Sequence, residues 1–254
     1  MADAVRPCGL LIEADHYAAQ VIDSSSGVVV VIPALNEAKR IGETVAAVLS
    51  AGVVAAVIVV DDGSSDETAR RAEVAGAQVV RHPRRCGKGA ALDTGTAAAA
   101  AHSARTLVFL DADLRTSASS WPTLAAPVLD GMADVSIATL PAQQAVGGGR
   151  GRVVRFARAG IETLTGFTAV QPLSGQRCLT IEAYEIVRPL AGGFGIEVGM
   201  TIDALRGGLR VVEVPVPFFH RVTGSDWRGR RHRARQLVHV ARTLAVRRLR
   251  SRRR

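Results

Sequence analysis

Three stretches of the chain consist only of valine, isoleucine, leucine and phenylalanine, and polar or turn-forming residues follow each one. They cover residues 28–32, 57–60 and 107–110. Continuous apolar runs of this length are typical of strands that are covered on both faces, as in a parallel sheet. Ligands of such sheets bind just beyond the carboxyl ends of the strands. The pattern therefore predicts a binding crevice where the three runs end.

Helical patterns separate these predicted strands. Four apolar residues after the first strand repeat at the spacing of one helix face: Ile41, Val45, Val48 and Leu49. Asn36 is the expected cap of that helix, and Ser64 and Glu67 are spaced as a capping box for the next. A short strand over 78–81 and an alanine-rich helix over 88–102 follow. The alternation predicts an α/β fold with a mostly parallel, doubly wound sheet flanked by helices.

The second half of the chain has a less regular pattern. A helix is expected over 153–165, and three apolar residues share a face of another: Ile196, Met200 and Leu205. The valine-rich run over 211–216 predicts a strand. Pro215 and Pro217 place that strand at a sheet edge, because proline cannot donate a backbone hydrogen bond.

Charge is distributed unevenly along the 254 residues. Residues 226–254 contain twelve arginines and one aspartate, a net charge of +11, so the first 225 residues carry −2 of the total of +9. Leu237, Val240, Leu244, Val246 and Leu249 approximate one helical face within this segment. Three interpretations stay open for this basic helical tail: an anionic membrane surface, non-specific nucleic acid, or a solvated end.

The remaining composition favours a cytoplasmic protein. The three cysteines are widely spaced and match no zinc or redox motif, which is typical of free thiols in a reducing compartment. No apolar run is long enough for a membrane span, and the first 27 residues lack the pattern of a signal peptide. We expect a cytoplasmic location, with peripheral contact at the inner membrane surface as an alternative.

Two acidic residues follow the third predicted strand, and a lysine lies between two glycines. Asp111 and Asp113 are two positions apart, so on an extended backbone both carboxylates would face one ligand. Mg²⁺ and Mn²⁺ prefer such oxygen ligands together with phosphate oxygens. Lys88 offers a point charge for phosphate. A P-loop is excluded, because His82 and Gly89 stand where that motif needs glycine and serine or threonine.

Three further carboxylates are candidates for ligand contacts. Glu37 and Asp62 follow predicted strands and suit ribose hydroxyls or base N–H groups, although helix capping explains them equally well. Glu197 falls in the first turn of its predicted helix, where the helix dipole favours an ionised carboxylate. It can accept hydrogen bonds from sugar hydroxyls, act as a base, or be an ordinary first-turn glutamate.

Together these blocks carry a family resemblance. Four motifs stand in order along the chain: residues 33–37 (PALNE), 61–66 (DDGSSD), 87–92 (GKGAAL) and 111–114 (DADL). They resemble the family 2-type glycosyltransferases with the GT-A fold. Residues 171–175 (QPLSG) and 193–199 (GFGIEVG) are similar to segments of the glucosyl-3-phosphoglycerate synthases and the related mannosyl enzymes.

The resemblance implies a site for a nucleoside diphosphate sugar, with UDP and glucose or mannose expected. The residues implied in donor binding are Pro33, Ala34, Leu35, Glu37, Asp62, Gly63, Lys88, Asp111, Ala112 and Asp113. It implies Mg²⁺ or Mn²⁺ as cofactor, with Asp113 and His220 as metal ligands. Glu197, Asp113 and Lys88 are then the expected catalytic residues.

The resemblance also implies an acceptor site, formed by Gly149, Arg150 and Ser174. The family loop Gly-Gly-Arg-Val-Thr, which binds phosphoglycerate, reads Gly-Gly-Arg-Gly-Arg over 148–152. We expect a phosphorylated small molecule such as 3-phosphoglycerate, or a lipid phosphate such as a polyprenyl phosphate at the membrane surface. A homodimer is an additional expectation, and no specific nucleic acid partner is expected.

The expected organisation has four parts. An N-terminal extension covers 1–27, the nucleotide-sugar-binding domain covers 28–140, the acceptor-binding part of the same GT-A domain covers 141–225, and the basic amphipathic tail covers 226–254. Two other classes compete with a transferase. A nucleotidyltransferase would carry a glycine-rich, arginine-containing loop after the first strand, and a non-catalytic protein would bind the donor without transfer.

Overall fold

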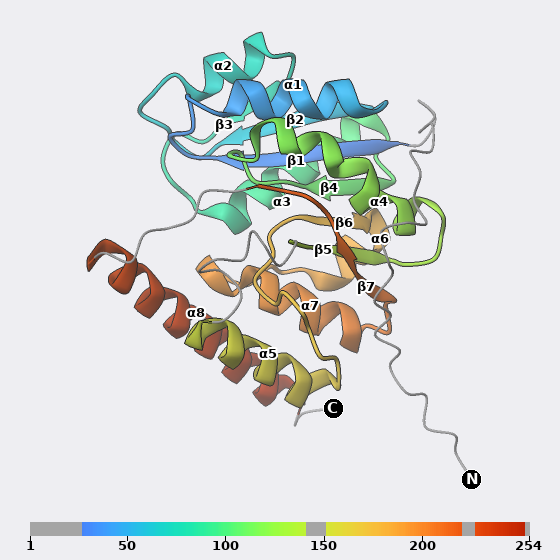
Figure 1. Cartoon of the computed structure of the whole chain (residues 1–254), viewed down its shortest axis with the longest axis vertical. Coiled ribbons are helices and arrows are strands. Elements are labelled where there is room, and N and C mark those ends of the chain that lie inside the picture. The colour runs from blue at the N-terminus through green and yellow to red at the C-terminus, as the bar shows by residue number, and fades with distance from the viewer. Residues whose placement is uncertain (1–26, 141–150, 220–226, 252–254) are drawn as a thin grey trace.

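A computed structural model describes residues 27–140, 151–219 and 227–251, with side chains only for residues 234–249 in the last range. The described residues form a sheet of seven strands in the order β3-β2-β1-β4-β6-β5-β7 (Figure 1). The strands are β1 (Val28–Ala34), β2 (Ala56–Asp61), β3 (Gln78–Arg81), β4 (Thr106–Phe109), β5 (Val135–Thr139), β6 (Arg177–Thr180) and β7 (Val211–Pro215). The mostly parallel α/β sheet predicted from the sequence is therefore confirmed.

Helices cover both faces of the sheet (Figure 1). One core layer includes side chains of α1 (Ile41–Ala51), α2 (Thr68–Val74) and α4 (Trp121–Leu129). The other layer includes side chains of α3 (Lys88–Ala99), α5 (Arg152–Thr165), α6 (Ile181–Val187), α7 (Ile196–Arg206) and α8 (Trp227–Ser251). Short 3₁₀ helices lie at η3 (Ala100–His102), η4 (Arg115–Ser120) and η5 (Gly193–Gly195).

The side chains of β1 alternate between these two layers. Val28, Val30 and Ile32 belong to the layer of α1, whereas Val29 and Val31 belong to the layer of α3. All five are fully buried. This is why an uninterrupted valine run is stable here: a strand covered on both faces has no polar face to keep.

The strand β6 is the part of the sheet that the hydrophobic pattern did not predict. It pairs antiparallel with both β4 and β5, and it has only four residues. Strand β7 pairs parallel with β5 at the end of the sheet, as its two prolines predicted. Because β6 separates β4 from β5, a segment from the second half of the chain lies in the middle of the sheet.

The predicted helix caps are wrong. Asn36 has a positive φ of 56° and lies outside α1, which begins at Ile41. The Asn36 carboxamide oxygen accepts a hydrogen bond from the backbone N–H of Ser65 at 2.9 Å, and its own N–H donates to the Ser64 hydroxyl at 2.9 Å. These polar side chains bond across two neighbouring loops instead of capping their own helices. They hold the loop after β1 against the loop after β2.

The C-terminal helix α8 packs against the body of the protein. Val240 is fully buried, and Leu244 lies over Gly160 of α5 so closely that a Cβ at this glycine would approach Leu244 Cδ1 to 2.4 Å. Arg247 forms an ion pair with Asp203 of α7. Two residues of the apolar face predicted for the tail, Val240 and Leu244, are therefore buried in the core where α8 contacts α5 and α7, whereas Leu249 of the same predicted face is exposed. Within the described ranges, we find no helix that combines the length and the apolar character needed to cross a membrane.

Gly95 is the point where α3 approaches the sheet most closely. A Cβ there would lie 2.3 Å from Val31 Cγ1 and 3.1 Å from Val60 Cγ2, both on buried, branched side chains. We predict that Gly95→Ala lowers the free energy of unfolding by roughly 1–3 kcal/mol through overpacking. Urea denaturation measures this change.

Gly42 of α1 provides the matched control, because a Cβ there meets only the Arg71 carbonyl oxygen at an ordinary 3.5 Å. Gly42→Ala should be neutral or stabilising by up to about 1 kcal/mol, since alanine favours helix more than glycine does. Equal effects of the two substitutions would contradict the close approach of α3 to the sheet.

Candidate functional site

The carboxyl ends of β1 and β2 lie side by side. Ala34, the last residue of β1, is in register with Asp61, the last residue of β2. The backbone N–H of Asp62 donates to the Ala34 carbonyl oxygen at 2.8 Å. Two motifs that are separate in the sequence therefore meet at one edge of the sheet, as their positions at strand ends predicted.

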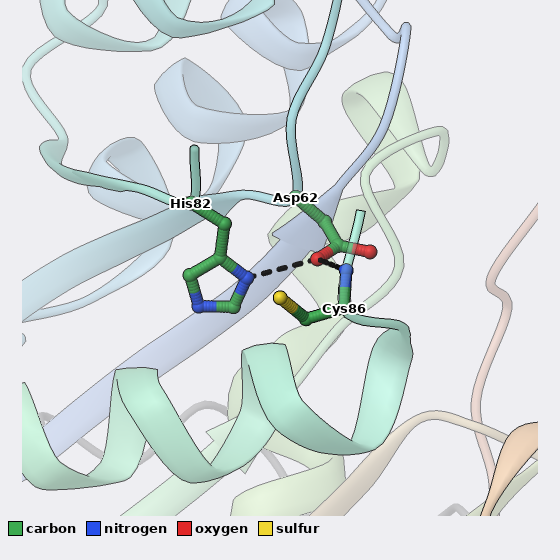
Figure 2. A group of neighbouring side chains, drawn as sticks. All are labelled: Asp62, His82 and Cys86. Carbon is green, nitrogen blue, oxygen red and sulfur yellow. Dashed lines mark hydrogen bonds and ion pairs between the residues drawn. The ribbon is translucent and has the colours of Figure 1, made fainter. Parts of the chain in front are cut away.

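Asp62 holds the loop that leads into α3 (Figure 2). Its Oδ1 accepts hydrogen bonds from the Cys86 N–H at 2.7 Å and from His82 Nδ1 at 2.9 Å, and its Oδ2 accepts from the Gly87 N–H at 2.8 Å. Burial raises the pKa of Asp62, but these hydrogen bonds outweigh it and hold the pKa below its usual 3.8. Asp62 is therefore ionised at neutral pH and fixes the start of α3.

Gly63 allows this loop to lie against the end of β2. It has a φ of +79°, and a Cβ at this position would lie 2.8 Å from the backbone atoms of both Arg84 and Arg85. Any side chain here would push the 84–87 segment away from Asp62. The close approach of the 84–87 segment to the end of β2 therefore requires a glycine at position 63.

Lys88 is the first residue of α3, and its ammonium lies between two carboxylates. The Nζ atom is 2.9 Å from Asp111 Oδ1 and 3.2 Å from Glu197 Oε1. Burial lowers the pKa of Lys88, but the charges of Asp111 and Glu197 outweigh it and raise the pKa above its usual value. A charged ammonium therefore joins the end of β4 to the first turn of α7. The three predicted site residues from distant parts of the chain are brought together.

Two residues of this cluster were missed by the sequence analysis. Gln176 donates a hydrogen bond from Nε2 to Asp111 Oδ2 at 2.6 Å. A Cβ on Gly175 would lie 2.5 Å from Lys88 Nζ and 3.3 Å from Asp111 Oδ2, so only glycine leaves this space open. Both residues precede the unpredicted strand β6, which explains why no periodicity indicated their place beside Asp111.

A buried arginine lies beneath the same turn. Arg177 is 1% exposed, donates from Nε to the Ser174 carbonyl oxygen at 3.1 Å, and donates from Nη1 to the Thr201 hydroxyl at 3.0 Å. Burial lowers the pKa of Arg177 to about 10, against the opposing charges of Glu197 and Glu213. The guanidinium fixes the 174–177 turn relative to α7, and the sequence analysis missed it as well.

Asp113 lies in a turn, so the prediction that Asp111 and Asp113 share one face of an extended backbone is wrong. Strand β4 ends at Phe109, so the extended backbone that would align Asp111 with Asp113 does not continue through residue 113. The Ala112 carbonyl oxygen instead accepts a hydrogen bond from Thr44 of α1 at 2.9 Å. In the part of the chain that the structure describes, the Asp113 carboxylate has no hydrogen bond or ion pair. Its oxygens are therefore available to a cation.

The other predicted residues divide into three groups. Pro33, Ala34 and Leu35 line the end of β1, and the Glu37 carboxylate accepts a hydrogen bond from Arg40 at 2.8 Å. Ser174 is buried, and its hydroxyl donates to Gln176 at 3.3 Å. Gly149, Arg150 and His220 lie outside the described residues, as does nearly all of the predicted N-terminal extension.

The arrangement defines a class of protein. Acidic residues after the strands, a glycine-rich turn and a lysine at a helix N-terminus lie at the carboxyl edge of one mostly parallel sheet. The profile of the family described as glycosyl transferase family 2 matches residues 29–184. This chain belongs to that family.

Individual proteins with assigned names are also similar to this chain. The glucosyl-3-phosphoglycerate synthase of Mycolicibacterium smegmatis is 35% identical over 194 residues, which cover 68% of this chain and 62% of that protein. The glycosyltransferase AglJ of Haloferax volcanii is 30% identical over 208 residues, 78% of this chain and 65% of that protein. The chain thus spans less than two thirds of the length of these curated relatives.

Solved structures of a glucosyl-3-phosphoglycerate synthase are similar to this chain in fold. The glucosyl-3-phosphoglycerate synthase of Mycobacterium tuberculosis, in complex with Mn²⁺, UDP-glucose and phosphoglyceric acid, superimposes with a TM-score of 0.74 at 28% identity. The match covers 94% of this chain and 88% of that one. A further complex of that enzyme holds Mn²⁺, UDP-glucose and glycerol 3-phosphate, with a TM-score of 0.68. The GT-A architecture predicted from the sequence is confirmed.

The hydrogen bonds of Asp62 generate a prediction about pH. Because its folded pKa lies below the usual 3.8, its ionised form contributes stability that is present above that value and lost as pH falls through the folded pKa. Asp62→Asn should therefore destabilise the protein at neutral pH, since its amide would face the Gly87 N–H. The difference from wild type should shrink below about pH 4.

Urea unfolding at a series of pH values measures this difference. Asp130→Asn, at an exposed position after α4, is the control and should show no such trend. A stability difference between wild type and Asp62→Asn that stays constant down to acid pH would contradict the ionic role of Asp62.

Proposed function

We propose that this chain transfers a hexose, glucose or mannose, from a UDP-sugar to a phosphorylated acceptor, with Mg²⁺ or Mn²⁺. The observation that carries the proposal is the Lys88 ammonium held between Asp111 and Glu197 at the carboxyl edge of the sheet. A cation at that point can neutralise a diphosphate, while a carboxylate beside it can hold sugar hydroxyls. The relatives described above support the reaction class.

The nucleoside would lie over the ends of β1 and β2. Pro33, Ala34 and Leu35 offer an apolar edge for the base, and Asp62 and Glu37 offer acceptors for base N–H groups and ribose hydroxyls. Gly63 allows the loop with Arg84 and Arg85 to lie close to this edge. Asp62 is already fixed by three donors, so it presents a preorganised carboxylate rather than one that must be ordered on binding.

The residues at the end of β4 fit a hard divalent cation. Among the described residues the Asp113 carboxylate has no partner and offers oxygens next to Asp111, whose own oxygens contact Lys88 and Gln176. Gly175 leaves room for the contact between Asp111 and Lys88, and His220 is the further ligand that the resemblance implies. When bound, such an ion stabilises the negative charge that develops on the departing diphosphate. Lys88 adds its own charge to the same phosphates, and the N–H groups at the start of α3 favour an anion there.

Glu197 would orient the transferred sugar. Its side chain is 12% exposed and ion-paired to Lys88 at 3.2 Å, so one carboxylate oxygen is held in place. The carboxylate can accept hydrogen bonds from sugar hydroxyls close to the diphosphate. We assign it, with Asp113 and Lys88, to the catalytic group.

The acceptor would bind beside the turn at 171–176. We assign Gly149, Arg150 and Ser174 to this region, with Arg150 contacting the phosphate and Ser174 acting through the shape of the turn. A small phosphorylated acid such as 3-phosphoglycerate is the favoured acceptor. The complexes of the M. tuberculosis enzyme with phosphoglyceric acid and glycerol 3-phosphate support this class.

A lipid phosphate is the second candidate acceptor, and the outer face of α8 favours it. Val238 and Leu249 are 63% and 62% exposed, and exposed arginines lie next to them at Arg235, Arg242 and Arg248. Apolar side chains rimmed by arginines suit the surface of an anionic membrane. This outer face is distinct from the inner face of Val240 and Leu244, which packs against the body.

Donor binding tests the proposed function directly. In a thermal-shift panel of UDP-, GDP- and ADP-sugars with and without Mn²⁺, we expect stabilisation by UDP-sugars with metal, about 2.7 kcal/mol at 100 times the dissociation constant. Asp113→Asn should remove the metal-dependent part of this shift, because its uncharged amide is a poor ligand for a hard cation.

Asp130→Asn, an exposed aspartate away from the strand ends, should behave as wild type. An unchanged metal-dependent shift in Asp113→Asn would contradict the metal assignment. Donor binding without transfer to any acceptor would favour a non-catalytic nucleotide-sugar binder.

Vesicle sedimentation tests the lipid alternative. If α8 contacts membranes, the protein should pellet with phosphatidylglycerol vesicles but not with phosphatidylcholine vesicles. The double variant Val238→Asp/Leu249→Asp should reduce that pelleting at least tenfold. Val74→Asp, which changes an 80% exposed valine on α2, is the matched control. Wild-type protein that stays in the supernatant would exclude this surface, and a change in oligomeric state in the double variant would assign it to a second copy.

A further inference from the structure

Three side chains of different chemistry meet beside the proposed nucleoside site (Figure 2). Asp62 follows β2, His82 follows β3, and Cys86 lies in the loop that leads into α3. One ligand atom from each, a carboxylate oxygen, an imidazole nitrogen and a sulfur, lies within 4.8 Å of the others. Figure 2 shows the Cys86 sulfur directed toward the His82 ring and the Asp62 carboxylate beside it.

The three residues differ in their access to solvent. The side chains of Asp62 and His82 are 7% and 12% exposed, whereas Cys86 is exposed. Asp62 and His82 are therefore held in the protein interior, and the Cys86 sulfur is accessible to an ion from solvent. The other described cysteine, Cys178, is buried in the sheet and cannot serve this site.

The surroundings of His82 prepare one nitrogen as a ligand. Its Nε2 lies 2.9 Å from the Thr94 hydroxyl of α3, and its Nδ1 lies 2.9 Å from Asp62 Oδ1. On zinc binding the imidazole proton would move from Nδ1 to Nε2, where the Thr94 hydroxyl can accept it, and the Nδ1 lone pair would then face the ion beside Asp62. Such hydrogen bonding of the second ring nitrogen is usual for histidines that bind metals.

We propose that Asp62, His82 and Cys86 form a binding site for a thiophilic cation, Zn²⁺, separate from the Mg²⁺ or Mn²⁺ position at Asp111 and Asp113. A thiolate, an imidazole and a carboxylate are the donors that zinc prefers, whereas magnesium and manganese favour oxygen ligands. Zinc at about 2.0–2.3 Å from each ligand needs the three atoms to lie roughly 3–4 Å apart. The three ligand atoms lie within 4.8 Å of one another and the Asp62–His82 pair is 2.9 Å apart, so small side-chain shifts would place all three around the ion.

Zinc at this site would compete with the donor. The ion would replace the proton between His82 Nδ1 and Asp62 Oδ1. It would also bind the Asp62 carboxylate, which we assign to the nucleoside. This consequence rests on the proposed function. Zinc should therefore weaken UDP binding through Cys86, not only by replacing the catalytic cation.

Cobalt(II) tests the site by a signal that is independent of activity. Titration of the full-length protein under a non-thiol reductant should give a cobalt–thiolate charge-transfer band that saturates at one ion per chain and is displaced by Zn²⁺. Cys86→Ser should abolish the band, while Cys8→Ser should retain it. His82→Asn should weaken cobalt binding by about 10–100-fold. Absence of the band, or its persistence in Cys86→Ser, would overturn the proposal.

Competition is measured separately. With Mn²⁺ in excess, one equivalent of Zn²⁺ should lower the UDP affinity of wild type at least tenfold and leave that of Cys86→Ser unchanged. Equal inhibition of both proteins would place the inhibitory zinc at the catalytic cation position and contradict competition through Cys86. Failure of UDP to bind at all would contradict the proposed function alone, because the cobalt band still decides whether the zinc site exists.

Discussion

The ammonium of Lys88 lies between carboxylates that come from opposite halves of the chain. Asp111 follows β4 in the first half of the chain, and Glu197 lies in the first turn of α7 in the second half. Without the lysine, two partly buried negative charges would lie close to each other, which is electrostatically unfavourable. The positions of α3, β4 and α7 are therefore coupled through one cation. The same cation is the natural contact for a diphosphate, which would share it with the carboxylates.

Two further residues, Asp62 and Arg177, fix the segments that carry Lys88 and Gln176. Asp62 fixes the loop in front of α3 by accepting hydrogen bonds from Cys86 and Gly87, which sets where Lys88 begins its helix. On the other side, Arg177 holds the turn that places Gln176 against Asp111. Buried charges of this kind cost free energy unless they are paired, so they fix a geometry more than they add stability.

The front half of the site could be predicted from the sequence because its signals are local. A continuous apolar run that is followed by Asp61 or Asp111 marks both a buried strand and the polar group at its end. Lys88 was recognisable because two glycines flank it and because it is one of only two lysines. The resemblance to family 2 glycosyltransferases added Glu197, whose first-turn position alone was equally consistent with an ordinary surface residue.

The rest of the fold and of the site depends on contacts between distant segments of the chain, which leave no local pattern in the sequence. Strand β6 is four residues long and antiparallel, so neither length nor periodicity distinguished it from a loop. Gln176 and Arg177 were missed with it. Asn36 and Ser64 looked like helix caps because capping residues also stabilise loops, and the structure uses them between loops. The apolar pattern of α8 likewise did not show that Val240 and Leu244 are buried in the core beside the other helices of that layer.

The central claim is that Lys88 contacts the diphosphate of a nucleotide donor. Calorimetric affinities of UDP and uridine, measured with Mn²⁺ for wild type, Lys88→Met and the exposed control Lys39→Met, test it most directly. A charge-assisted hydrogen bond is worth about 1.5–3 kcal/mol, roughly 10–150-fold in affinity. We expect Lys88→Met to lose this factor for UDP and to keep its affinity for uridine, while Lys39→Met changes neither affinity. Equal losses for UDP and uridine, or no loss for UDP, would contradict it.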